Sequence, residues 1–390
     1  MIAEKIAGKN LRLFYGIGFI LALSNALIAY VNSSYLGEFW GAANVGLVFI
    51  AAYAVSLVVV NFFPDVINYL KIYLASLAAL CLMFLGLLGL GAAAGPWAAL
   101  IFFIFYVVCL NLIWISLDVY VEYFSVDSRT GRIRGMYWTL VNLAWFLAPV
   151  ASGLILKRYN YPVLFYAADV LLFIALMFFT FGFRRLKPDH FSENYFFRNL
   201  ARVWQTGSLR RIFIIDFLLQ LFYCLMIIYT PLYLHAVIGF NWEQIGLIFA
   251  AMLFNFVYMT YPAGWLADTK FGEKGMIIAG LFIMGLATLA FALIHGRNFW
   301  LFFAALFFTR VGASLVDILK DSYFFKHVNS RDLPIINMFR NTVPLAYIIG
   351  PLLAIIILRF ADYRLLFVSL ALLVLAGGGY ALGLKNTGRS

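Results

Sequence analysis

Ionisable and amide side chains interrupt several long apolar stretches of this sequence. Arg310 lies within residues 299–319, and Asp216 and Gln220 lie one helical turn apart within residues 212–234. A charge inside a hydrocarbon layer costs several kcal/mol, so each is a functional candidate. A guanidinium binds an anionic or carbonyl-bearing group, and a carboxyl group can carry a proton. We expect Asp216 to pair with Arg310 when the site is empty; the alternative is a permanent ion pair that only joins two helices.

Three mid-depth amides are weaker candidates for solute contact: Asn25, Asn111 and Asn255. An amide inside an apolar helix joins helices about as often as it binds a ligand. Asp169 is ionisable and also lies in an apolar stretch, and the sequence suggests no role for it beyond a neutral, hydrogen-bonded carboxyl.

A second group of polar residues lies where apolar stretches meet the loops on one side. We expect these residues to close that side by bridging to helix starts. They are Asp65, Lys71, Asp118, Glu122, Arg134, Gly264, Asp268, Lys274, Asp317, Asp321 and Arg340, with Lys320 among them. Ordinary loop charges at the level of lipid headgroups are the alternative reading.

No catalytic or cofactor site is predicted. The four histidines all lie between apolar stretches, and there is no glycine-rich phosphate loop with its lysine and hydroxyl. Cys81, Cys109 and Cys224 lie in apolar runs and indicate neither a disulfide framework nor a metal site. We therefore expect a protein that is not an enzyme and that holds no metal and no cofactor.

The composition points to a bilayer as the solvent. The chain has 390 residues, of which 65% are hydrophobic and 12% charged, so it cannot supply the surface of a soluble domain. This excludes a soluble enzyme and a nucleic-acid-binding domain. The net charge of +11 is assigned to loops on one side of a membrane.

Twelve apolar stretches are long enough to cross about 30 Å of hydrocarbon as helices. The predicted spans are 11–36, 45–63, 72–91, 96–119, 135–156, 162–183, 212–234, 244–266, 276–294, 299–319, 334–358 and 365–384. Placing both termini in the cytoplasm puts most of the 28 basic residues inside, as the positive-inside rule requires. We expect a multi-pass protein of the cell membrane.

The predicted domains are a six-helix half at 1–183, a cytoplasmic linker at 184–211 and a second six-helix half at 212–390. Residues 191–204 of the linker are expected to form a short amphipathic helix on the membrane surface, with a solvated linker as the alternative.

The two halves repeat each other at an offset of about 200 residues. The segment NVGLVF at 44–49 recurs as QIGLIF at 244–249, Asp65 and Lys71 correspond to Asp268 and Lys274, and Asn142 corresponds to Asn341. Because each half has an even number of spans, both have the same orientation. Parallel repeats of this kind are typical of transporters, with the solute site between the halves.

The motif GWLADTKFGEK at 264–274 resembles the cytoplasmic loop of the major facilitator superfamily, with one extra residue before Gly272. Its counterpart NFFPDVINYLK at 61–71 has Asn61 and Tyr69 where glycines are expected. APVASG at 148–153 resembles the proline-glycine motif of proton-coupled exporters. The resemblance implies that spans 1, 4, 7 and 10 line a central cavity, which would place Arg310, Asp216 and Gln220 on the solute path.

We therefore predict a twelve-helix secondary transporter, all α-helical, that moves a small organic solute by alternating access. Proton coupling is favoured over uniport, export over import, and a monomer over an oligomer. The alternative, favoured by the altered first loop, is a transporter-like receptor or scaffold that binds a ligand without moving it. Flux in reconstituted vesicles separates the two.

Overall fold

The computed structural model describes residues 2–124, 130–184, 203–328, 335, 338–339 and 341–385, and every regular element among them is helical. Ten helical segments are long and apolar enough to cross a membrane. One of them, α3 (Val45–Gly91), contains two predicted spans, and α9 (Trp242–Tyr258) is a shorter apolar helix. The described residues thus account for all twelve predicted spans.

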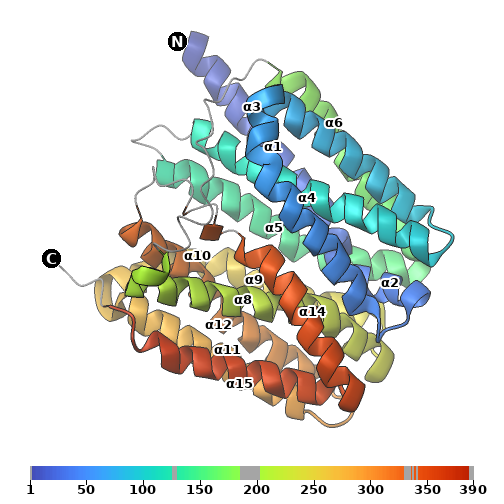
Figure 1. Cartoon of the computed structure of the whole chain (residues 1–390), viewed down its shortest axis with the longest axis vertical. Helices are drawn as coiled ribbons and strands as arrows, with labels where there is room; N and C mark the ends of the chain where they lie inside the picture. The colour runs from blue at the N-terminus through green and yellow to red at the C-terminus, as the bar shows by residue number, and fades with distance from the viewer. Residues whose placement is uncertain are drawn as a thin grey trace. The chain divides into compact units, whose positions relative to one another are not determined.

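The chain divides into two compact units, one comprising Met1–Ala42 and Ala51–Ser192, the other Ala43–Ile50 and Glu193–Ser390. The first contains α1 (Ile2–Ala29), α2 (Asn32–Trp40), most of α3, α4 (Pro96–Phe124), α5 (Thr130–Arg158) and α6 (Tyr161–Phe183). In this unit α1 packs against α5 and α6 (Figure 1). Phe14 on α1 is fully buried and stacks on Tyr137 of α5.

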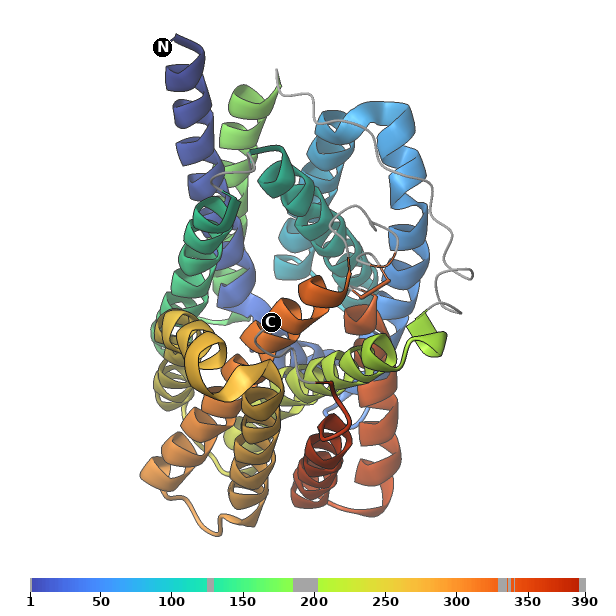
Figure 2. The ribbon, with the colours of Figure 1, turned by 90° about the vertical axis from the view of Figure 1, so that its left-hand side faces the viewer.

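Two predicted spans of the first unit differ from simple helices. The span 11–36 is broken at Tyr30–Val31 into α1 and α2, next to Asn32 and two serines, residue types that favour helix ends over helix interiors. The spans 45–63 and 72–91 form the two limbs of α3. Figure 2 shows these limbs folded back on each other at a kink, where Lys71 has φ 68° and ψ 151°.

The second unit contains the remaining elements. They are α8 (Gly207–Leu232), η1 (Tyr233–Val237), α9, α10 (Thr260–Leu266), η2 (Ala267–Phe271), α11 (Gly272–Leu293), α12 (Phe299–His327), α14 (Thr342–Phe360) and α15 (Tyr363–Ala381). Here α11 packs against both α12 and α15, while α8 packs against α12, α14 and α15 (Figure 1).

Two glycines bring α11 and α12 into backbone contact. A Cβ on Gly312 would lie 2.4 Å from the backbone N of Met284, and one on Gly280 would lie 2.9 Å from the backbone O of Gly312. Small residues permit this close approach where helices pack in a membrane. The crossing fixes which face of α12 turns toward α11.

The extra residue in the 264–274 motif is absorbed by a single wide helical turn. Over η2 the helix is of the π type, and the N–H of Gly272 bonds to the O of Ala267, five residues earlier. A π-type turn accommodates one inserted residue without breaking the helix. Gly272 then has φ 67° and ψ 159°, almost the conformation of Lys71 in the first unit.

The sequence pairs Lys71 with Lys274, whereas the turn conformation of Lys71 matches that of Gly272, two residues earlier. Sequence and backbone therefore relate the two loops at registers that differ by two residues. Residues 191–202 of the predicted surface helix lie outside the described residues.

Candidate functional site

The predicted central residues of the second unit lie at the packing face between α8 and α12. Asp216, Gln220 and Tyr223 follow one another at spacings of four and three residues, which places them on one face of α8. On α12, Arg310 precedes Gly312 by two residues, about 200° around the helix. Because Gly312 contacts α11, Arg310 points away from α11 and toward α8.

Arg310 is a buried cation that lies against two aromatic rings. The residue is 1% exposed, and neither Nη1 nor Nη2 has a partner among the residues that the structure describes. Its guanidinium carbon lies over two rings of α8, 5.0 Å from the centroid of Phe222 and 5.4 Å from that of Tyr223. The rings supply cation–π attraction, about 0.5–2 kcal/mol each, but no anion.

The expected ion pair between Asp216 and Arg310 is not formed. Asp216, 1% exposed, instead has its Oδ1 2.7 Å from the Nζ of Lys320. The prediction was wrong because of depth. Lys320 lies ten residues beyond Arg310, about 15 Å further along α12. This part of α12 is level with the first turns of α8. Asp216 lies near the start of α8 and therefore meets Lys320.

Two neutral donors complete the surroundings of Asp216. Gln220 donates to its Oδ1 at 3.2 Å, and the hydroxyl of Thr342, at the start of α14, donates to its Oδ2. The carboxylate thus joins α8, α12 and α14. The sequence placed Gln220 beside Asp216 correctly, but it gave no sign of Thr342, because no helical spacing connects positions so far apart in the chain.

Lys320 stands between one buried and two more exposed carboxylates. Its Nζ lies 3.4 Å from Asp317 and 3.2 Å from Asp321, whose side chains are 36% and 56% exposed, compared with 2% for Asp216. The Nζ also lies 5.1 Å from the ring centroid of Phe339. Sequence reasoning grouped Lys320 with the inner-edge charges and missed it as the counter-ion of Asp216.

The three amide candidates are engaged in contacts between helices. Asn25 accepts from the Tyr106 hydroxyl at 2.5 Å, and Asn111 donates to Ser56 at 3.0 Å. Asn255, fully buried, donates to the O of Phe307 at 3.3 Å and accepts from the Tyr258 hydroxyl at 2.7 Å. These bonds favour the helix-joining alternative for Asn255, whose donors and acceptor are both occupied.

The predicted gate residues fall into four groups. Asp65 and Lys71 are exposed, whereas Asp118, Arg134, Gly264 and Lys274 are partly buried. Asp317 and Asp321 hold Lys320 within their own unit. The side chains of Glu122 and Asp268, and all of Arg340, lie outside the described residues.

Glu273 adds a buried charge that the sequence analysis did not select. It directly follows Gly272, is 2% exposed, and forms an ion pair with Lys326 near the end of α12. Ser322, one turn earlier on α12, donates to the same carboxylate oxygen at 3.3 Å. The pair fastens the start of α11 to α12 beside the 264–274 motif.

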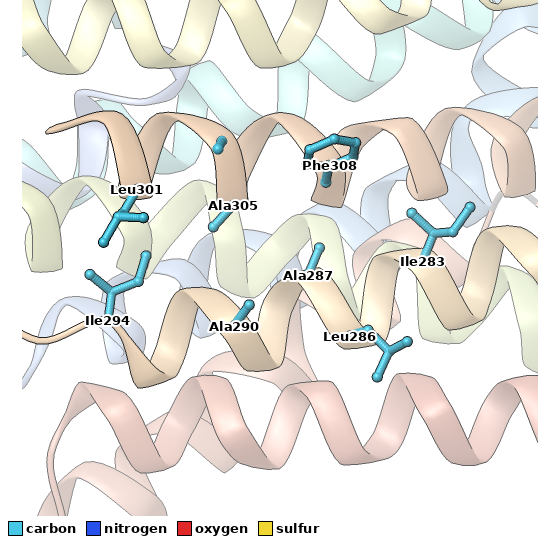
Figure 3. A pocket seen from close by; sticks show the side chains of 9 residues that line it. Ile283, Leu286, Ala287, Ala290, Ile294, Leu301, Ala305 and Phe308 are labelled. Atoms are coloured by element: carbon cyan, nitrogen blue, oxygen red, sulfur yellow. The ribbon is translucent and has the colours of Figure 1, made fainter. Parts of the chain in front are cut away.

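A groove of about 480 Å³ runs between α11 and α12 (Figure 3). Its lining is entirely apolar and comprises Ile283, Leu286, Ala287, Ala290, Ile294, Leu301, Ala304, Ala305 and Phe308. Such a lining cannot orient a polar solute, and none of the predicted site residues belongs to it. Among the described residues, no group of His, Cys, Asp and Glu side chains is arranged to hold a metal ion.

Comparison with known proteins supports the fold and the kind of protein. The sequence profile of the Major Facilitator Superfamily matches residues 14–316 and 243–387. A solved structure of a peptide transporter, POT, in complex with sulfate matches with a TM-score of 0.75 and 14% identity, over 96% of this chain and 94% of that one. The human organic anion transporter MFSD10 (TETRAN) matches with a TM-score of 0.72 and 13% identity, over 96% and 99% of the two chains. Identities this low show a shared fold alone, and no protein of curated function matches.

Proposed function

This chain belongs to the Major Facilitator Superfamily, and on that premise we propose that it moves a small organic solute across the cell membrane by proton-coupled alternating access. Family membership makes it a multi-pass membrane transport protein. The proposal adds the coupling ion, the residues that act, and the orientation with both termini in the cytoplasm. It rests above all on one observation: a buried carboxylate, Asp216, that is paired with a lysine inside a bilayer-spanning region.

The coupling step follows from the charges around Lys320. When Asp216 is ionised, its attraction for Lys320 holds α8 to α12. When Asp216 takes up a proton, that attraction is lost, while Lys320 keeps its charge and two carboxylate partners, Asp317 and Asp321. Protonation therefore loosens α8 from α12 without leaving an unpaired ammonium ion in the bilayer. A ligand that changes one contact in this way can bias a two-state transporter.

Arg310 is the proposed solute contact. It lies on the same α8–α12 face as Asp216 and offers unsatisfied donors for an anionic or carbonyl-bearing group. Gln220 lies between the two sites along α8 and contacts Asp216. Asn25, Asn111 and Asn255 are proposed to join the helices that surround the solute path rather than to bind the solute directly.

The 264–274 loop is proposed to close the cytoplasmic side together with the first-unit loop, through Gly264, Asp268, Lys274, Asp65 and Lys71. Asp118, Glu122, Arg134 and Arg340 are proposed to receive these loops at neighbouring helix starts and ends. The turn conformation persists at Lys71 although the glycine is missing. This preserved backbone favours a working gate over the receptor or scaffold reading, which rested on the altered first loop. Export is the proposed direction. It is proposed because the APVASG segment at 148–153 in α5 resembles the proline-glycine motif of proton-coupled exporters.

Flux measurements in proteoliposomes test the proposal. Purified protein is reconstituted, and a mixture of sugars, amino acids, organic anions and lipophilic cations is offered with and without an outward proton gradient, because an exporter that exchanges solute for protons takes solute up as protons leave the vesicle. Mass spectrometry of the vesicle contents then shows whether any solute accumulates. We expect accumulation of one class that depends on the gradient and is absent with Asp216→Asn. Binding of a solute without any flux would support the receptor reading instead.

A further inference from the structure

The guanidinium of Arg310 is a positive charge without a counter-charge among the described residues of the second unit. Its terminal nitrogens are buried and unbonded, and the described carboxylate nearest to it on α8, Asp216, already pairs with Lys320. An unpaired charge or donor in a buried site is strongly unfavourable. Asp216 is also bonded to Gln220 and Thr342 at the level of Lys320, about 15 Å along α12 from Arg310, so it cannot reach the guanidinium unless α8 shifts along α12. Among the described residues of this unit no other group supplies the missing partner, and a bound solute can supply it.

The surroundings of Arg310 select the shape of that partner. Rings of Phe222 and Tyr223 lie against its guanidinium carbon, so aromatic and apolar surface borders the cation. The two orphaned groups, Nη1 and Nη2, are the pair that binds both oxygens of a carboxylate side by side. A compact inorganic anion would gain nothing from the rings, whereas an organic acid can bury its apolar body against them.

The charge balance selects a monoanion. One guanidinium neutralises one negative charge, and a dianion such as a phosphate monoester would leave an excess charge in the same buried region. The described residues near Arg310 provide no second cation, because Lys320 is surrounded by three carboxylates. We propose that the solute is an organic monocarboxylate with an apolar or aromatic body, bound through its carboxylate to Nη1 and Nη2 of Arg310. The inference rests on the proposed function and names the substrate class of that site.

Ligand-dependent thermal stability and isothermal titration test this directly on the detergent-purified full chain. The probes are sodium benzoate, 3-phenylpropionate, hexanoate and decanoate at matched ionic strength. Each is compared with its neutral amide, and the aromatic series also includes benzylamine and phenyl phosphate. We expect saturable binding by at least one carboxylate and none by its amide, by the amine or by the phosphate ester.

Three variants assign the effect to Arg310. Arg310→Gln removes the charge and should weaken carboxylate binding by about 10- to 100-fold, the loss of a charge-assisted hydrogen-bond pair. Arg310→Lys keeps the positive charge but lacks the two parallel N–H donors. Its affinity for the carboxylate should lie between those of the wild type and Arg310→Gln. Arg297→Gln is the matched control, since Arg297 also lies over a phenylalanine ring, 5.7 Å from the centroid of Phe240, but is exposed; it should bind like the wild type.

The inference is overturned if no carboxylate of the series binds, if the amides bind equally well, or if Arg310→Gln retains wild-type affinity while remaining folded. These outcomes are separate from a failure of the transport proposal. Gradient-driven flux of a neutral solute would leave transport intact and refute the substrate class. A carboxylate that binds through Arg310 but never crosses the membrane would support the ligand class and refute transport.

Discussion

Lys71 and Gly272 adopt nearly the same positive-φ backbone conformation, each where the chain turns before the next long apolar helical segment. Their φ values are 68° and 67°, in a region that only glycine enters without strain. The repeat has kept the turn while replacing the residue that suits it. Lys71 is the only non-glycine residue with positive φ in the described part of the chain.

Lys71→Gly should therefore stabilise the protein. Relief of the strained conformation contributes about 1–3 kcal/mol, and the added backbone freedom of glycine in the unfolded chain offsets about 1 kcal/mol of it. We expect a higher thermal midpoint in detergent, by fluorescence-detected unfolding. Gly272→Ala is the converse variant and should lower the midpoint. A lower midpoint for Lys71→Gly would show that the lysine side chain contributes more than its backbone costs.

Gly312→Ala should destabilise the second unit, because the new Cβ would lie 2.4 Å from the backbone of α11. Forcing the helices apart typically costs about 1–3 kcal/mol and would also shift Arg310, two residues away. Gly379→Ala is the control: it lies in α15 with no atom within 4 Å of the added Cβ, and it should be neutral or slightly stabilising. Equal midpoints for the two variants would contradict the close α11–α12 crossing.

Substitutions at the Asp216–Lys320 pair should be unequal. Lys320→Met leaves the carboxylate of Asp216 buried without its cation, a loss of about 3–5 kcal/mol. Asp216→Asn should cost less, because Lys320 keeps Asp317 and Asp321. Thermal midpoints of the two variants at neutral pH measure this difference.

The double variant Asp216→Asn with Lys320→Met completes the cycle. It should be more stable than Lys320→Met alone, because the buried side chain at position 216 is then neutral, while Asp317 and Asp321 lose Lys320 in both variants. If Lys320→Met matched the stability of Asp216→Asn at neutral pH, the two residues would not act as a buried pair.

Arg310→Met should separate stability from function. Because the cation has no acceptor, replacing it with an apolar side chain of similar length should raise the thermal midpoint while abolishing solute flux. Arg297→Met should leave both unchanged. A drop in stability together with intact flux would instead assign Arg310 the purely structural role that the sequence left open.

The sequence predicted the spans, the all-helical fold and the helices that carry buried charge, because apolar length and isolated charges are both local signals. It did not predict which charges meet. Helical spacing gave the face of α8 that holds Asp216 and Gln220. Whether Asp216 meets Lys320 or Arg310 depends on the position of α12 along the axis of α8, which helical spacing does not give. The π-type turn at Ala267–Phe271 and the turn at Lys71 were equally hidden, since both depend on loop register.

Proton movement driven by solute is the most direct test of coupling at Asp216. Proteoliposomes containing a pH-sensitive dye are given an inward gradient of the solute that accumulates in the flux screen, with no initial pH gradient. The proposed mechanism predicts a pH change inside wild-type vesicles. It also predicts none with Asp216→Asn, which should still exchange labelled for unlabelled solute. Solute entry without a pH change in the wild type, or an undiminished pH change with Asp216→Asn, would contradict it.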